Sequence, residues 1–282
     1  HAGCEIAGRL TEEAAYHLGL RAGIPVSVGG GDGACANVGA GVVEPGHFYL
    51  SLGTTAWIAG PMEKPFLDPQ HRVFHMYTMD GHGCNVFGTM QCAGRSISWA
   101  QELLGYNSPR AMDAAAETVA PGAGGLIYLP YLEGERSPVF DAKARGVFFG
   151  MNTMHKREHF ARAVLEGTGC GLAQILSAFR EREPIESLRI IGGGAKSPVW
   201  KQIIADLCQV RLLEVSTFSD SATSMGAAAA AGVGIGLYPD LPTAVAHIQT
   251  TGSTDPQPHP EYELTKKKYG MLYPSLVDVF RT

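Results

Sequence analysis

Glycine clusters that directly follow short apolar segments constrain the fold of this chain more than any other feature. Three glycines lie at residues 29–31 and three at residues 192–194, and the single Gly53 marks a third such position. Each follows a segment with strand-like character. Glycine allows the backbone to approach a ligand closely, and ligands of open α/β sheets bind beyond the ends of the strands. The clusters therefore predict a ligand-binding cleft along one edge of a sheet.

Expected strands and helices alternate along most of the chain. Strands are expected at residues 25–28, 73–79, 85–88, 126–132, 188–191 and 210–215, and a β-hairpin at 47–58 with its turn at Gly53. Helices are expected at residues 11–20, 33–41, 97–104, 156–182, 198–209, 222–232 and 261–280. In the helix at 156–182, apolar side chains recur at spacings of three and four. This alternation predicts an α/β fold with a partly parallel sheet.

Charge and cysteine usage exclude several classes of partner. The 282 residues carry a formal net charge of −5 and contain no long basic run, which argues against a nucleic acid or an anionic membrane as partner. No signal peptide or membrane-spanning apolar run is visible. The six cysteines form no C-x-x-C pair and are scattered through expected core segments. We interpret them as buried, reduced thiols of a cytoplasmic protein.

Asp32 follows the first glycine cluster and precedes an expected helix. A carboxylate at the end of a strand can point into a cleft, where it could accept a proton from a substrate hydroxyl or help to hold Mg²⁺. A second interpretation is that Asp32 only caps the following helix. The local pattern leaves both open.

The other two turns have the composition of phosphate and nucleotide sites. The hairpin segment 51–55, SLGTT, offers backbone N–H groups and hydroxyls that can surround phosphate oxygens, although an ordinary turn has the same composition. The segment 192–197, GGGAKS, lies between a strand and a helix, as a nucleotide site requires. It is not the dinucleotide fingerprint, because Ser197 replaces the last glycine, and it is not a P-loop.

Three charged residues outside these turns have open roles. Glu135 and Arg136 could form an exposed structural pair or line the cleft. Glu166 lies inside the expected helix 156–182 and could either approach the nucleotide or be a buried, hydrogen-bonded carboxylate.

Taken together and in order, these segments resemble the C-terminal part of the FGGY carbohydrate kinases. The resemblance covers nearly the whole chain and rests on residues 20–46, 51–55, 132–150, 158–171 and 190–207. It implies the ribonuclease H-like (actin-like ATPase) fold, an α/β fold with a mixed β-sheet flanked by helices.

The resemblance also implies roles for individual residues, with ATP and Mg²⁺ as co-substrate and cofactor. Asp32 would be the general base and a candidate Mg²⁺ ligand. The remaining assignments concern the nucleotide: Gly53, Thr54 and Thr55 would hold the β- and γ-phosphates; Gly193, Gly194 and Ala195 would contact the adenosine or the α-phosphate; and Lys196, Ser197 and Trp200 would flank the adenine.

In one respect the chain departs from the family pattern. No D-x-G-T phosphate loop occurs in it, whereas the family carries one near the start of an N-terminal domain. We therefore expect a fragment in which residues 1–44 are the tail end of the N-terminal domain and residues 45–282 are the C-terminal, nucleotide-binding domain. The missing N-terminal domain would carry most of the sugar site. A homodimer is compatible with the sequence.

The sequence thus predicts an ATP-dependent sugar kinase. The segments SLGTTAWI and GERSP favour a xylulokinase-like substrate, with gluconate, ribulose, fuculose and glycerol as alternatives. A hypothesis of another class is a nucleotide-binding module that binds MgADP and catalyses nothing on its own. A non-catalytic sensor or scaffold is disfavoured by the presence of Asp32, and a Rossmann oxidoreductase by the incomplete fingerprint.

Overall fold

A seven-stranded mixed sheet forms the centre of the molecule, in the order β11-β10-β9-β3-β4-β6-β5. The computed structural model describes residues 1–216 and 221–282. The strands of the sheet are β3 (Tyr49–Leu52), β4 (Ala56–Met62), β5 (Phe74–Tyr77), β6 (Cys84–Met90), β9 (Ser187–Ile191), β10 (Arg211–Val215) and β11 (Thr250–Thr254). Two small two-stranded sheets pair β1 (Ile6–Arg9) with β2 (Pro25–Ser27) and β7 (Ile127–Leu129) with β8 (Val147–Phe149).

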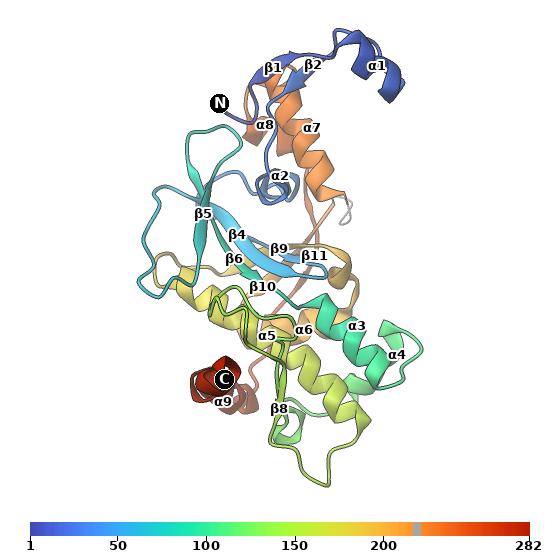
Figure 1. Cartoon of the computed structure of the whole chain (residues 1–282), viewed down its shortest axis with the longest axis vertical. Helices are drawn as coiled ribbons and strands as arrows, with labels where there is room; N and C mark the ends of the chain where they lie inside the picture. The colour runs from blue at the N-terminus through green and yellow to red at the C-terminus, as the bar shows by residue number, and fades with distance from the viewer. Residues whose placement is uncertain (217–220) are drawn as a thin grey trace.

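Helices cover both faces of the central sheet (Figure 1). On the upper face lie α2 (Asp32–Gly39), α7 (Ala222–Gly234) and α8 (Leu241–Val245), with β1, β2 and α1 (Glu12–Leu18) beyond them. On the lower face lie α3 (Gly94–Leu103), α4 (Pro109–Glu117), α5 (Arg157–Arg180), α6 (Pro198–Cys208) and α9 (Pro260–Arg281). Short 3₁₀ turns are η1 (Ala123–Gly125) and η2 (Gly193–Lys196).

The register of the central strands brings two glycine-rich turns to one edge of the sheet. β3 pairs antiparallel with β4 across the turn at Gly53. β3 also pairs parallel with β9, with Ser51 opposite Ile191. Because parallel strands end at the same edge, Gly53 and Gly192 leave the sheet side by side.

The long helix α5 supports this sheet from below. Its residues from Ala161 to Leu172 are all buried, and a side-chain carbon on Gly88 of β6 would lie 2.3 Å from a methyl group of Ile175. Such a close approach requires glycine in the strand. The strands that carry the turns therefore rest on a rigid base.

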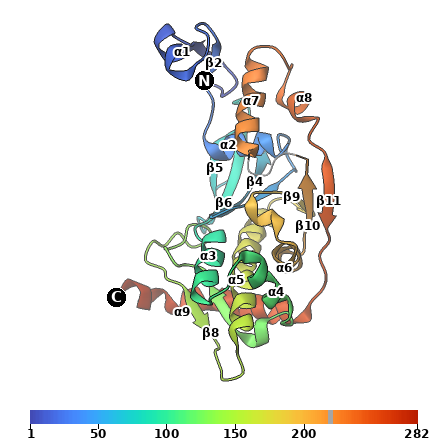
Figure 2. The ribbon, with the colours of Figure 1, turned by 90° about the vertical axis from the view of Figure 1, so that its right-hand side faces the viewer.

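Small residues allow α2 and α7 to pack at backbone distance on the upper face, where Figure 2 shows them crossing. A Cβ atom on Gly226 of α7 would lie 1.9 Å from the carbonyl oxygen of Cys35 in α2, and one on Gly39 would lie 1.7 Å from that of Ala222. The small residues Ala222 and Gly226 of α7 thus have a packing role. This contact sets the position of α2, and so of Asp32, above the sheet.

Most of the elements expected from the sequence are confirmed within one to three residues, including the turn of the hairpin at Gly53. Among the described residues, five helices and strands differ from the expectation, because none was predicted there: β1, α4, β8, α8 and β11. All six cysteines are free and buried, as expected. Among the residues that the structure describes, no helix combines the length and the apolar character needed to cross a bilayer.

We predict that Gly226→Ala destabilises the chain by about 1–3 kcal/mol, because the added methyl group overpacks the α2–α7 contact. The matched control is Gly270→Ala in α9, where the nearest atom would lie 3.6 Å from the new carbon. That variant should have a free energy of unfolding about 0.5–1 kcal/mol higher, because alanine has a higher helix propensity than glycine. Urea unfolding of both variants checks the contrast, and equal stability changes would contradict the packing argument.

Candidate active site

The turn between β3 and β4 is held from behind by the start of α3. Gly94 N donates to the Gly53 carbonyl at 2.9 Å, and Ala93 N and Arg95 N donate to the Thr54 carbonyl at 3.1 and 3.0 Å. A Cβ atom on Gly94 would lie 2.5 Å from the Gly53 oxygen, so this position also requires glycine. The carbonyls of the turn are therefore directed towards α3.

Two amides of the same turn differ from its carbonyls in having no partner. Within the described parts of the chain, neither Thr54 N nor Thr55 N donates a hydrogen bond, and Thr54 is exposed. Backbone N–H groups that are left unpaired in a turn form a site for anions. The turn consequently has the properties needed to hold phosphate oxygens without an added positive charge.

The second glycine turn touches the first. Gly192 has φ +95°, and a Cβ atom there would lie 2.6 Å from the Leu52 carbonyl oxygen. A Cβ atom on Gly194 would lie 2.6 Å from the Leu52 side chain and 2.7 Å from the Trp200 ring. After η2, Ser197 Oγ accepts from Trp200 N at 3.0 Å and caps α6. Two glycine contacts with Leu52, at Gly192 and Gly194, thus hold the two turns together.

Both turns open into one cavity of about 1130 Å³, which is large enough for a nucleotide. Its walls are α3, α4, η2 and the start of α6. Seven of the residues predicted from the sequence line it: Gly53, Thr54, Gly193, Gly194, Lys196, Ser197 and Trp200. Ala195 does not line the cavity, because its side chain packs against the main core. Trp200 is buried, lines the cavity and donates from Nε1 to Thr168 Oγ1 at 2.9 Å, so it is part of the cavity wall.

One whole wall of this cavity was not predicted. Helix α4 contributes Pro109, Arg110, Asp113 and Glu117, and Ser108 lies at its start. A serine followed by proline is a helix-start signal, since Ser108 Oγ accepts from Ala111 N and Pro109 occupies the first helical position. That signal could have located the wall.

Charges of both signs line the cavity. Arg110 and Lys196 bring positive charge, and Asp113 and Glu117 bring negative charge. Burial raises the pKa of Asp113, while the neighbouring Ser197 hydroxyl lowers it and Glu117 raises it further. The cavity can therefore offer both hydrogen-bond acceptors and cations to a bound molecule.

Asp32 lies in a second, smaller cavity of about 130 Å³ on the upper face of the sheet. It is exposed at the start of α2, and its Oδ1 accepts from Gly33 N at 2.8 Å. Tyr49 OH donates to the Gly33 carbonyl at 3.3 Å and accepts from Trp57 Nε1 at 2.7 Å. This chain of hydrogen bonds fixes the start of α2 to β3 and β4.

Thr55 lines the cavity of Asp32, although its neighbours Gly53 and Thr54 line the larger one. Thr89 and Arg136 lie in the same small cavity. The turn between β3 and β4 is therefore the common boundary of the two cavities.

Glu166 contacts neither cavity. Its Oε1 accepts from Arg162 Nε at 2.6 Å, from Gly122 N at 2.9 Å and from Tyr262 OH at 3.2 Å. Burial raises the pKa of Glu166, and the Arg162 charge acts in the opposite direction. The network connects α5 to α9, so Glu166 is the buried, hydrogen-bonded carboxylate of the two interpretations that the sequence left open.

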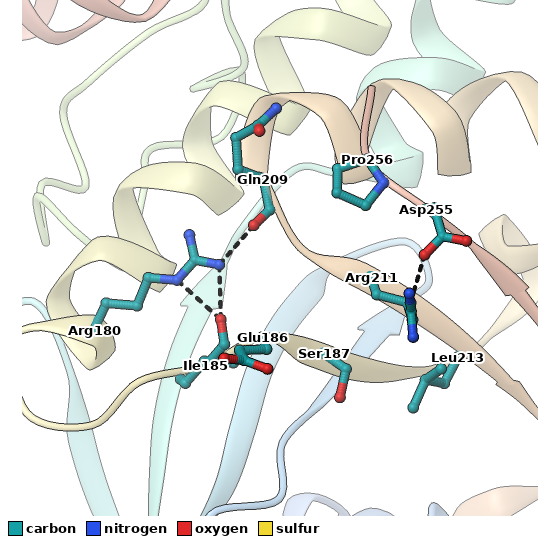
Figure 3. A pocket seen from close by; sticks show the side chains of 9 residues that line it. All are labelled: Arg180, Ile185, Glu186, Ser187, Gln209, Arg211, Leu213, Asp255 and Pro256. Carbon is teal, nitrogen blue, oxygen red and sulfur yellow. Dashed lines mark hydrogen bonds and ion pairs between the residues drawn. The ribbon is translucent and has the colours of Figure 1, made fainter. Parts of the chain in front are cut away.

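A third hollow lies at the opposite edge of the sheet and has a different character (Figure 3). It is formed at Ser187 and Arg211, the first residues of β9 and β10. Its guanidinium groups are already engaged, since Arg180 donates to the Ile185 and Gln209 carbonyls and Arg211 pairs with Asp255. These contacts stabilise the strand starts, and among the described residues that line this hollow no arginine is left free for a phosphate.

Comparisons with known proteins identify the family of the chain. The sequence model of the FGGY family of carbohydrate kinases, C-terminal domain, matches residues 48–235. The xylulose kinase of Escherichia coli is 34% identical over 284 residues, which cover 98% of this chain and 57% of that protein. The gluconokinase of Bacillus subtilis is 28% identical, covering 98% of this chain and 55% of that protein.

A solved structure shows the same arrangement. The xylulose kinase of Rhodospirillum rubrum superimposes with a TM-score of 0.86 at 28% identity, over the full chain and 58% of that protein. The chain spans somewhat more than half the length of these relatives. It belongs to the FGGY family of carbohydrate kinases, and its mixed sheet flanked by helices has the actin-like ATPase fold of that family.

We predict that Gly193→Val lowers the affinity of the chain for MgADP at least tenfold, about 1.4 kcal/mol. A Cβ atom at Gly193 meets no atom within 4 Å, so the valine would fill the cavity without disturbing the fold. Calorimetric titration measures the affinity. Gly8→Val, at an equally open glycine far from the cavity, should bind MgADP normally, and equal affinities in the two variants would refute the placement of the nucleotide.

Proposed function

We propose that the protein containing this chain transfers the γ-phosphoryl group of ATP to a hydroxyl of a small sugar or sugar acid. The observation that carries the proposal is the turn at residues 53–55, which separates a nucleotide-sized cavity from the cavity of Asp32. A phosphate chain that starts in the larger cavity and crosses this turn ends beside a carboxylate. This is the geometry that phosphoryl transfer needs, because its catalysis consists mainly of positioning and charge stabilisation.

Each group of residues would have its own role in the transfer. Gly193, Gly194, Lys196 and Ser197 would hold the adenosine and the α-phosphate, and the amides of Thr54 and Thr55 would hold the β- and γ-phosphates. Asp32 would accept the proton of the attacking hydroxyl. The new bond joins the sugar oxygen to the γ-phosphorus, and the bond from that phosphorus to the bridging oxygen breaks and leaves ADP.

Mg²⁺ fits this site as a partner of the phosphates. No group of three or more histidine, cysteine, aspartate or glutamate side chains in the described residues could hold a metal ion alone. Mg²⁺ is usually bound by one or two carboxylates together with phosphate oxygens and water. Asp32 would supply the carboxylate, and the ion would neutralise charge on the phosphates.

The relatives support xylulose as the acceptor and gluconate as the second candidate, because proteins named for each are similar over nearly the whole chain. We propose that residues 1–44 are the end of a preceding domain that contributes most of the sugar site, and that residues 45–282 form the nucleotide-binding domain. The six buried, free cysteines support the reducing cytoplasm as the compartment. Without the preceding domain, the chain would bind MgADP and turn over no sugar.

We predict that Asp32→Asn in the full-length protein lowers kcat for sugar phosphorylation by about 10²–10⁴-fold, because the amide cannot accept the proton. The affinity for MgADP should not change. A coupled assay of ADP release with xylulose and gluconate measures the first quantity, and calorimetry the second.

Asp278→Asn is the matched control, because Asp278 is exposed on α9 and lines neither cavity. It should phosphorylate sugar at the unaltered rate. Turnover of Asp32→Asn close to that of this control would show that Asp32 is not the base.

A further inference from the structure

The segment Glu133–Pro138 occupies a strand edge that the sheet leaves free. β5 pairs with β6 only from Cys84 to Phe87. Beyond that point, Ser137 N donates to the Thr89 carbonyl at 2.8 Å, and Thr89 N donates to Ser137 Oγ at 3.0 Å. The segment therefore continues the sheet beside the last residues of β6.

This position lies next to the phosphate turn. Thr89 and Met90 of β6 pair with Trp57 and Ala56 of β4, and Ala56 directly follows Thr55. Directly paired side chains share one face of a sheet. Thr89, Trp57 and Arg136 line the cavity of Asp32, so the segment borders that cavity.

A buried carboxylate fixes the backbone at Arg136. Glu135 is 4% exposed, and its Oε1 accepts from Gln91 N at 2.5 Å and from Arg136 N at 2.8 Å. The other oxygen, Oε2, is buried and has no partner in the described structure. Burial raises the pKa of Glu135 to about 8, and the two amides act in the opposite direction. Burying a carboxyl group is costly, and here it orders one short segment of backbone.

The Arg136 side chain extends from this fixed backbone into the cavity. It lines the same cavity as Asp32 and Thr55 and is exposed. Among the described residues, its guanidinium makes no hydrogen bond and no ion pair with another side chain. The charge of Arg136 lowers the pKa of the adjacent Glu135, and a positioned guanidinium matches the oxygens of a phosphoryl group in both charge and geometry.

We propose that Arg136 contacts the phosphoryl group while it passes from the nucleotide to the acceptor. The inference rests on the proposed kinase activity and adds a residue that the three glycine turns do not include. The cation compensates the charge that spreads over the transferred group. That group would lie between the amides of the turn and the carboxylate of Asp32.

The test compares Arg136→Gln and Arg136→Lys with wild type in the full-length protein. Arg136→Gln should lower kcat about 100-fold or more, the usual effect of removing one such donor, and leave MgADP affinity and the melting temperature unchanged. Arg136→Lys should recover part of the rate, because it keeps the charge and loses the planar fork. Arg145→Gln is the matched control, because Arg145 bonds to the Ala142 and Ala144 carbonyls of the same loop, outside the cavity. It should leave kcat unchanged.

Several results would overturn the inference. Turnover of Arg136→Gln within about threefold of wild type, well below the loss expected for a phosphoryl contact, would exclude that contact. A raised KM for the sugar at unchanged kcat would assign Arg136 to the acceptor. A lowered melting temperature with equal losses in Arg136→Lys would make its role structural. Absence of both MgADP binding and sugar turnover in wild type would instead reject the proposed function, and the inference with it.

Discussion

The parallel pairing of β3 with β9 is the contact on which the rest of the site depends. It aligns Ser51 with Ile191, so the turns that follow the two strands leave the sheet together. Their backbones then touch at Gly192 and Leu52. A one-residue slip of this register would reverse the faces of one strand and separate the turns. The cavity between α3, α4, η2 and α6 exists because this register holds.

The candidate base is carried by a different part of the molecule from the phosphate turn. Asp32 lies on α2. The close backbone packing of α2 against α7 sets the position of this helix above the sheet. The hydrogen bond from Tyr49 OH to the Gly33 carbonyl fixes its first turn. The turn belongs to the sheet and rests on α3 and α5. The two supports are joined by that hydrogen bond, because Tyr49 belongs to β3. Thr54 and Thr55, at the boundary between them, line different cavities.

Local signals in the sequence predicted the parts of this arrangement that are locally determined. The hairpin at Gly53 follows from β-branched residues on both sides of a glycine, and the helix at 156–182 follows from its apolar periodicity. The capping signal at Ser108 and Pro109 was also local but was overlooked. No local signal could show that Arg136 lines the same cavity as Asp32. That proximity depends on where β5 stops pairing with β6, which is a contact between distant segments. The role of Asp32 also stays a prediction, because its local pattern fits a helix start equally well.

The most direct test of this account is a crystal structure of the chain with a non-hydrolysable ATP analogue and Mg²⁺. The account predicts adenosine in the cavity between α4 and α6, with phosphate oxygens within hydrogen-bond distance of the Thr54 and Thr55 amides. The γ-phosphate should then lie at the boundary that the turn forms with the cavity of Asp32. A nucleotide bound at the opposite edge of the sheet, or one whose phosphates point away from the turn, would contradict the central claim.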